Sequence, residues 1–212
     1  MQYEDTLYPL QNKVLAVLDG LGTSLYLTGG TAVSRFYYNH RYSDDLDFFC
    51  HSEPDFHGII EKIFRALESF GVEQRIRAEN FSSLYIGGLL KVDMVNDVAS
   101  HIGDFLKHGL FSRVDNLENI LANKLSALLG RSNPKDVADI WVIAVNSPVN
   151  WKKIFQYAGT KAGGIYPPII AERLETFPVE WLDDIKWIPG KKPAADRFKE
   201  DIRRITGELL HI

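Results

Sequence analysis

The stretch LYLTGGTAVSRFYYNHRYSDDLDFFC, residues Leu25–Cys50, determines the expected fold and points to a chemistry. It opens as an apolar run, breaks at the pair Gly29-Gly30, and continues with a pattern that predicts a helix. It then closes with Asp45 and Asp47, which lead directly into two phenylalanines and therefore into a buried strand. Residues i and i+2 of a strand project from the same face, about 6.5 Å apart along the chain.

Two carboxylates at this spacing predict a site for divalent cations. Hard oxygen ligands suit Mg²⁺, and phosphoryl-type chemistry commonly uses two such ions about 3.5–4 Å apart. A solvated strand edge is the alternative, but acids at the mouth of a buried strand are costly unless a cation compensates them. Upstream, Gly29, Gly30 and Thr31 would let backbone N–H groups approach a phosphate, although an ordinary strand-to-helix turn has the same glycines. Together the two features predict metal-dependent nucleotidyl transfer.

The overall composition is that of an ordinary soluble globular protein, with 212 residues, 45% hydrophobic and 25% charged. A net charge of −4 gives no general attraction to nucleic acid, so any RNA contact must come from a local basic patch. The single cysteine, Cys50, cannot form an internal disulfide and is expected in the core. We see neither a signal peptide nor an apolar run long enough to cross a membrane, so we expect a cytoplasmic protein without membrane association.

The periodicity of apolar residues predicts an α/β (α+β) domain over residues 1–114 and a helical domain over residues 115–212. In the first domain we expect helices at 9–21, 31–39 and 56–70, and strands at 72–78, 81–86 and 89–95. In the second we expect helices at 116–129, 134–145, 151–158 and 193–210, with loops at 160–168 and 188–193. Ser132 or Asn133 would cap the helix that begins at Pro134.

Asp93 is a lone acid in the apolar-biased segment LLKVDMVND. An acid inside such a strand needs a partner. One interpretation is a salt bridge with a neighbouring lysine or arginine. The other is that Asp93 lies beside Asp45 and Asp47 and supplies the third carboxylate of a two-metal site.

Lys124 falls inside the apolar arc of its predicted helix, between Leu117 and Ile120 on a helical wheel. Such a lysine can extend its ammonium group to the edge of the apolar face. Alternatively, it can neutralise a triphosphate as a point charge. Asp136 follows in the first turn of the next helix, where a carboxylate is favourable for the helix dipole alone.

These blocks carry a resemblance to a known family. GGTAVSRFYYNHRYSDDLDFF resembles the first motif of the AbiEii/AbiGii-type nucleotidyltransferases, the toxin components of type IV toxin–antitoxin pairs. KVDMV resembles their third-carboxylate strand, and NKLSALLGRSNPKDVADI resembles their later motif, in which a lysine and a basic-Asp pair face the nucleotide. The matching positions are His40, Arg41, Ser43, Asp45, Asp47, Asp93, Lys124, Arg131, Lys135, Asp136 and Asp139. Residues 150–212 resemble nothing that we recognise.

The resemblance implies a polymerase-β-like nucleotidyltransferase domain with a mixed sheet, followed by a helical domain. Its cofactor would be Mg²⁺, with two ions held by Asp45, Asp47 and Asp93, and its substrate a nucleoside triphosphate. Lys124 would join these acids in catalysis. Nucleotide binding would fall to Gly29, Gly30, Thr31, Arg41, Ser43, Lys124 and Asp136.

The same resemblance implies a partner and a class of acceptor. Family members are encoded with an antitoxin protein, and they modify tRNA ends or act on proteins. Two further hypotheses remain open from the sequence. One is a nucleotidyltransferase for a small molecule such as an antibiotic, and the other is a non-catalytic nucleotide-binding module. A plain structural protein would require the three polar blocks to be a coincidence.

Overall fold

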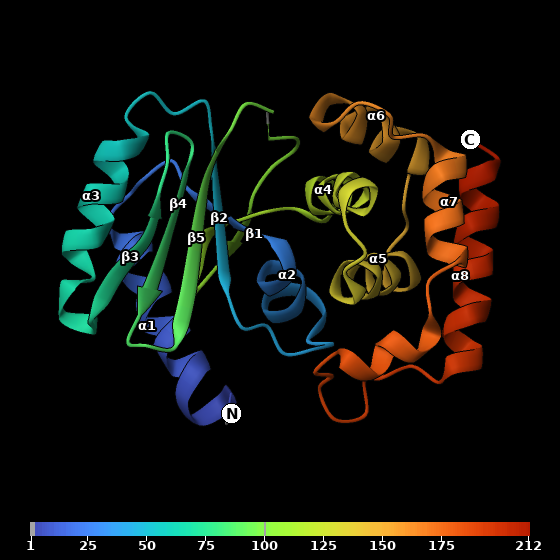
Figure 1. The fold of residues 1–212 in the computed structure, drawn as a ribbon, viewed down its shortest axis with the longest axis horizontal. Coiled ribbons are helices and arrows are strands. Elements are labelled where there is room, and N and C mark those ends of the chain that lie inside the picture. The colour runs from blue at the N-terminus through green and yellow to red at the C-terminus, as the bar shows by residue number, and fades with distance from the viewer. Residues whose placement is uncertain (1–2, 100) are drawn as a thin grey trace. The chain divides into compact units, whose positions relative to one another are not determined.

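The computed structural model describes residues 3–99 and 101–212 (Figure 1). Contacts between Cα atoms divide the chain into two units. The first is formed by the chain up to Ala32 and by Ser43–Asp115, and the second by Val33–Tyr42 and Asn116–Ile212. The sequence places a single boundary between residues 114 and 115. The contacts place it one residue later, and they also assign residues 33–42 to the second unit.

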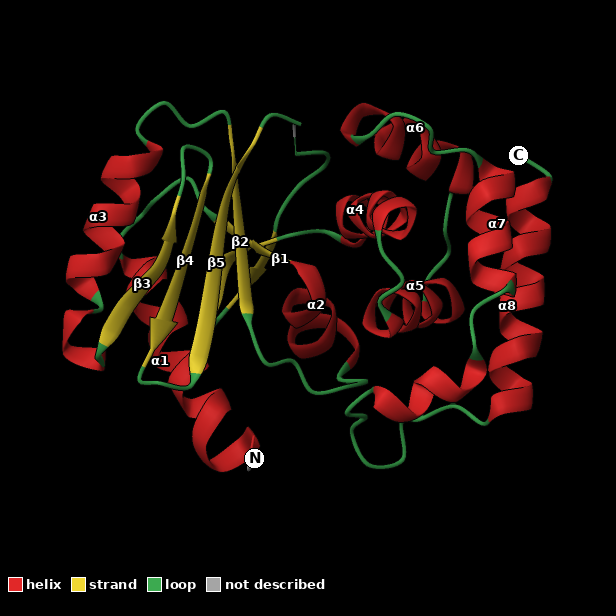
Figure 2. Ribbon diagram, viewed as in Figure 1, coloured by secondary structure: helices red, strands yellow, loops and turns green. Residues whose placement is uncertain are grey.

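The first unit contains a seven-stranded mixed sheet in the order β3-β4-β5-β2-β1-β7-β6. Figure 2 shows the neighbouring strands β3, β4, β5, β2 and β1 of this order. Strand β2 runs parallel to β5 and antiparallel to β1, and β1 runs parallel to β7. The strands are β1 (Tyr26–Thr28), β2 (Leu46–His51), β3 (Val72–Arg77), β4 (Phe81–Ile86), β5 (Leu90–Asp97), β6 (Leu106–His108) and β7 (Phe111–Val114). The mixed sheet predicted from the sequence is confirmed.

Alternation along the central strands separates an apolar face of the sheet from a polar one. In β2 the buried residues are Leu46, Phe48 and Cys50, while Asp47 projects from the other face and is partly exposed. The apolar face packs with helices α1 (Tyr8–Gly20) and α3 (Phe56–Ala66), whose inward residues are also buried. Each large apolar side chain buried in this way contributes about 1.5–3 kcal/mol. The core therefore fixes the direction in which Asp47 points.

The second unit is helical. Its helices are α4 (Leu117–Gly130), α5 (Pro134–Asn146), α6 (Trp151–Lys161), α7 (Pro167–Glu175) and α8 (Ala195–Leu210). The Asn133 side chain accepts a hydrogen bond from the backbone N–H of Lys135, so the cap of α5 is Asn133 rather than Ser132. No helix in the described part of the chain is long and apolar enough to cross a membrane.

Several elements differ from the sequence-based expectation. Helix α7 begins inside the segment predicted as a loop, because its two leading prolines occupy first-turn positions where a missing N–H is tolerated. Strands β6 and β7 are too short to show an alternating pattern. The helix expected over 56–70 ends at Ala66, and a 3₁₀ turn over Glu68–Phe70 completes it before Gly71 takes a left-handed conformation.

Candidate active site

The turn after β1 brings the backbone of Gly29 against the carboxylate of Asp47. Gly29 has a φ of +69°, which side-chain-bearing residues rarely adopt. A Cβ atom added there would lie 2.6 Å from Asp47 Oδ2 and 3.3 Å from its Cβ. A glycine is therefore required for both conformation and space. The short helix α2 (Gly29–Thr31) begins at this residue and continues as a π-helical stretch over Ala32–Tyr38.

Thr31 connects this turn to the acidic segment before β2. Its hydroxyl oxygen lies 2.7 Å from the hydroxyl oxygen of Ser43, and it donates a hydrogen bond to the backbone carbonyl of Asp45. Thr31 and Ser43 are both buried. The contacts hold the loop at a fixed distance from the glycine turn, so two of the predicted nucleotide-binding residues position a predicted metal ligand.

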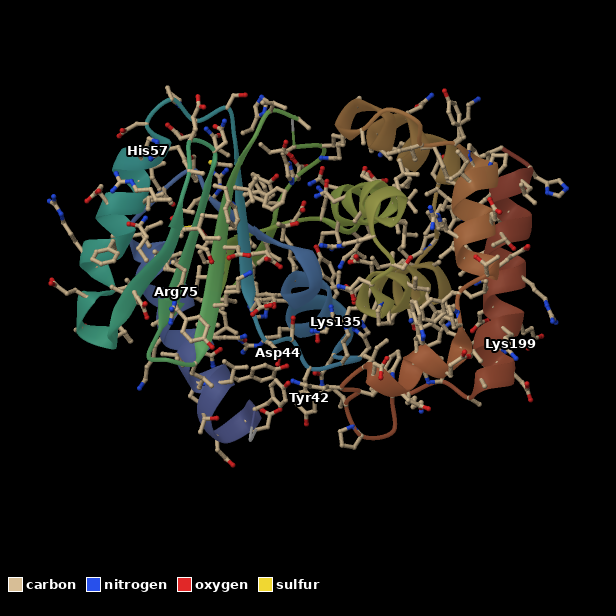
Figure 3. All side chains as sticks on the ribbon, in the orientation of Figure 1. Tyr42, Asp44, His57, Arg75, Lys135 and Lys199 are labelled. Atoms are coloured by element: carbon tan, nitrogen blue, oxygen red, sulfur yellow. The ribbon has the colours of Figure 1, made fainter. Side chains whose placement is uncertain are left out.

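Helix α1 and the residues before it hold the other side of the same loop. The buried Gln11 side chain donates from Nε2 to the carbonyls of Ser43 (3.1 Å) and Asp44 (3.4 Å). The Tyr8 hydroxyl accepts from the Ser43 N–H at 3.3 Å, and the Tyr3 hydroxyl donates to the Asp44 carboxylate, labelled in Figure 3. Sequence reasoning missed Gln11, although an amide among the apolar residues of a helix face was an available signal.

Asp115 is a second residue that sequence reasoning missed. It is fully buried and accepts a hydrogen bond from the Thr28 hydroxyl at 2.5 Å. Its other oxygen lies 2.9 Å from His101 Nε2. Because Thr28 directly precedes Gly29, Asp115 anchors the end of β1 from which the glycine turn starts. The preceding strand β7 is short and contains Ser112 and Arg113, so no local pattern marked this acid.

Asp47 and Asp93 are direct partners in the parallel pairing of β2 with β5. Neighbouring strands lie about 4.8 Å apart, and paired residues project from the same face of a sheet. Asp45 precedes the first residue of β2 by one position, so it lies beside this pair in the chain. All three side chains are partly exposed. The pairing of β2 with β5 thus places two of the predicted carboxylates, Asp47 and Asp93, side by side although they are far apart in the sequence.

Both oxygens of Asp93 have protein partners. The Ser83 hydroxyl donates to Oδ1 at 2.6 Å from the neighbouring strand β4, and the Lys91 ammonium lies 2.5 Å from Oδ2. The hydrogen bond with Asp93 raises the pKa of Lys91, and the charges of Asp93, Asp45 and Asp47 add to this effect. The two interpretations of Asp93 are therefore compatible. It forms a salt bridge with a neighbour, and it lies beside Asp47.

The chemistry of these donors fits Mg²⁺, which prefers carboxylate oxygens. Among the residues that the structure describes, however, no group of three or more His, Cys, Asp or Glu side chains is arranged to hold a metal ion. The assignment of Asp45, Asp47 and Asp93 as metal ligands stays a prediction.

A buried cluster of charged residues in the second unit is centred on Asp139. Arg41 binds this carboxylate with two donors, Nε at 2.8 Å and Nη2 at 2.9 Å. Lys124 Nζ lies 2.7 Å from Oδ2, and His40 Nε2 lies 2.9 Å from Oδ1. Burial alone would raise the pKa of Asp139, but Arg41 and Lys124 outweigh it and hold that pKa well below its ordinary value. Asp139 is therefore ionised.

Lys124 and Asp136 extend the cluster. Lys124 Nζ lies 2.7 Å from Asp136 Oδ1, and Arg131 Nε lies 2.7 Å from Asp136 Oδ2. Burial would lower the pKa of Lys124, but Asp139 and Asp136 raise it, so the ammonium stays charged. In His40, burial lowers the pKa despite the contact with Asp139, so the imidazole is neutral at pH 7.

The cluster gives three predicted nucleotide-binding residues a structural role. Arg41 is 2% exposed, Asp136 1% and Lys124 8%, and each is ion-paired. Lys124 is paired inside the helical unit instead of extending to its surface. Whether Arg41, Lys124 and Asp136 also contact a nucleotide stays a prediction from the resemblance.

Comparison with solved structures identifies the fold. MenT4, a nucleotidyltransferase toxin from Mycobacterium tuberculosis H37Rv, is similar with a TM-score of 0.66 and 14% identity, over 97% of this chain and 83% of that chain. JHP933 from Helicobacter pylori is similar with a TM-score of 0.59 and 17% identity, over 97% and 93% of the two chains. The fold is that of the polymerase-β-like nucleotidyltransferases, as the sequence resemblance implies.

The family follows from the sequence. The model of the family described as nucleotidyl transferase AbiEii toxin, type IV toxin–antitoxin system, matches residues 13–208. The chain belongs to this family, and the resemblance stated from its motifs is confirmed. The match also includes most of the segment after residue 150, where the motifs gave no guidance. No curated protein matches the chain.

We predict that Gly29→Ala displaces the Asp47 carboxylate, because the new methyl group would lie 2.6 Å from Oδ2. Misplacement of a reacting group by about 1 Å can cost on the order of 100-fold in turnover, and we expect a loss of that size. Labelled NTP incorporation measures it. Gly20→Ala is the matched control, because nothing lies within 4 Å of its added Cβ. Equal activity of the two variants would show that the close approach has no role.

We predict that Asp139→Asn lowers the free energy of unfolding by about 3–5 kcal/mol at pH 7, because Arg41 and Lys124 lose a buried anionic partner. Since the folded-state pKa is lowered, the carboxylate stabilises the fold fully above its unfolded pKa of about 3.9. This contribution is lost as the pH falls through the folded-state value. The difference in the free energy of unfolding between wild type and Asp139→Asn should therefore become smaller at acidic pH.

Urea unfolding at pH 7 and at pH values below the unfolded pKa measures this difference. Asp184→Asn, which removes an exposed acid from the same unit, is the control and should change little. A deficit in Asp139→Asn that stays constant with pH would contradict the assignment of an ionised Asp139.

Proposed function

We propose that this nucleotidyltransferase moves a nucleoside monophosphate from a nucleoside triphosphate to an RNA acceptor in a Mg²⁺-dependent reaction. The observation that supports this most directly is the pairing of Asp47 with Asp93 across β2 and β5, next to the turn at Gly29. Nucleotidyl transfer needs carboxylates at one point and a surface of backbone N–H groups beside them.

In this proposal Asp45, Asp47 and Asp93 would hold the cations. When bound, Mg²⁺ supplies charge neutralisation at the transferring phosphate and activates the attacking hydroxyl. The protein's own contribution is positioning. Core packing aims Asp47, the contacts of Thr31, Ser43 and Gln11 fix the loop that carries Asp45, and Ser83 orients Asp93. Such preorganisation is a major part of catalysis in phosphoryl transfer.

The phosphates of the nucleotide would lie against the backbone N–H groups of Gly29, Gly30 and Thr31. The absence of a side chain at Gly29 keeps this surface open beside Asp47. The Ser43 hydroxyl, which contacts Thr31, adds a polar group at the same turn. The resemblance also assigns nucleotide binding to Lys124, Arg41 and Asp136.

An RNA acceptor is favoured over a protein by a cavity of about 470 Å³ within the helical unit. Its lining combines the aromatic rings of Tyr38 and Trp141 with the cations Lys191, Lys192 and Arg197. Lys192 pairs with Asp183 and Arg197 with Asp201, whereas no ion pair is assigned to Lys191 in the described part of the chain. Rings beside cations are the usual means of binding single-stranded nucleic acid.

We also propose the biological setting, in which the chain acts as a toxin and is neutralised by a protein antitoxin. Support comes from the family, which is described as the toxin of a type IV toxin–antitoxin system. The cofactor, acceptor and antitoxin are independent parts of the proposal.

We predict that Asp47→Asn lowers NMP transfer by at least about 100-fold, because the carboxylate that would bind the cation becomes a neutral amide. The fold should persist, since Asp47 is partly exposed and its neighbours Leu46 and Phe48 provide the burial. Incorporation of each labelled NTP into total RNA, with and without EDTA, measures the effect.

Asp97→Asn is the matched control, since it lies on β5 beyond the carboxylate pair. Transfer that resists EDTA, or that survives in Asp47→Asn, would overturn the metal-dependent mechanism. Parallel reactions with purified tRNA, a protein mixture and aminoglycosides identify the acceptor. Labelling of a small molecule alone would support the antibiotic-modifying alternative.

A further inference from the structure

Lys91 lies next to the predicted metal site of Asp45, Asp47 and Asp93. It is two residues before Asp93 on β5, so both side chains project from the same face of the sheet. Its ammonium is 2.5 Å from Asp93 Oδ2, and the charges of Asp45 and Asp47 also act on it. Lys91 is thus ion-paired with one of the three carboxylates assigned to the metal site, and the charges of the other two act on it from a greater distance.

The pairing has a direct consequence for Asp93. Ser83 binds its first oxygen at 2.6 Å and Lys91 its second at 2.5 Å, so a cation that approaches the second oxygen meets the Lys91 ammonium, which repels it. Ser83 is buried and 2% exposed. The Lys91 side chain is 44% exposed and can swing into solvent. Lys91 is therefore the partner that is free to leave.

We propose that Lys91 is a built-in counter-ion of the carboxylate site, which a divalent cation must displace from Asp93 in order to bind. The ammonium offsets part of the repulsion among the three acids when no metal is present. The same contact weakens metal binding, because the cation must break a short ion pair before it gains a ligand. This inference rests on the proposed function, since it concerns the same three carboxylates.

The experiment is a calorimetric titration of the whole chain with Mn²⁺, without nucleotide. We expect Lys91→Gln to bind Mn²⁺ about three- to tenfold more tightly than wild type, the range expected for loss of a partly exposed ion pair and a nearby positive charge. Lys91→Arg keeps the charge and should stay close to wild type. Lys107→Gln removes an equal charge from an exposed position on β6 of the same unit and should also stay close.

Thermal unfolding gives a second readout that is independent of activity. In EDTA, Lys91→Gln should melt below wild type, because the three carboxylates lose their nearby cation. Saturating Mn²⁺ should raise its melting temperature by more than it raises that of wild type. The order of the two proteins by Mn²⁺ affinity and by Mn²⁺-induced shift should agree.

Each outcome decides between the proposals. Mn²⁺ binding by Lys91→Gln but not by wild type would support the counter-ion role most strongly. Equal or weaker binding by Lys91→Gln would overturn it, and would leave the proposed function intact if Asp47→Asn still abolishes binding. Binding by neither protein would overturn this inference together with the metal-dependent mechanism.

Discussion

The close approach of the Gly29 backbone to the Asp47 carboxylate is the constraint on which the first unit's site depends. It requires a residue without a side chain at a left-handed position, directly after a strand whose end is anchored by Thr28 on Asp115. It also requires that β2 present Asp47 on the polar face, which the burial of Phe48 enforces. The polar contacts of Gln11 and Thr31 then complete the loop between these two strands.

The second unit solves a different electrostatic problem. It buries several ionised groups together. Asp139 is contacted by four nitrogen atoms from Arg41, Lys124 and His40. Asp136 is paired with two cations, Lys124 and Arg131. Buried ion pairs of this kind add little net stability compared with apolar packing, but each member becomes essential once its partners are present. The cluster therefore connects α4, α5 and the segment that carries Arg41 through paired charges.

Most of the architecture could be predicted from the sequence because the apolar periodicity of its longer helices and strands is strong. Alternation into Phe48 and the cap of α5 were visible locally, whereas β6, β7 and α7 lack a pattern of sufficient length. The site was predictable only in its residue types. The sequence left two kinds of partner open for Asp93, a basic residue or another acid of the site. The structure has both, because Lys91 forms an ion pair with Asp93 and the register of β2 with β5 places Asp47 beside it. Gln11 is visible locally as an amide on an apolar helix face, but the hydrogen-bond partners of Gln11 and Asp115 lie far away in the sequence, where no local pattern identifies them.

The assignment of residues 33–42 to the helical unit affects how this protein can be recombined with its relatives. Asp139 finds Arg41 and His40 in that early segment, almost a hundred positions upstream. A chimera joined at residue 115 would inherit a helical half whose anion comes from one parent and whose guanidinium comes from the other. Gene exchange within the family should therefore keep the segment of His40 and Arg41 together with the helix that carries Asp139, although the two are far apart in the sequence.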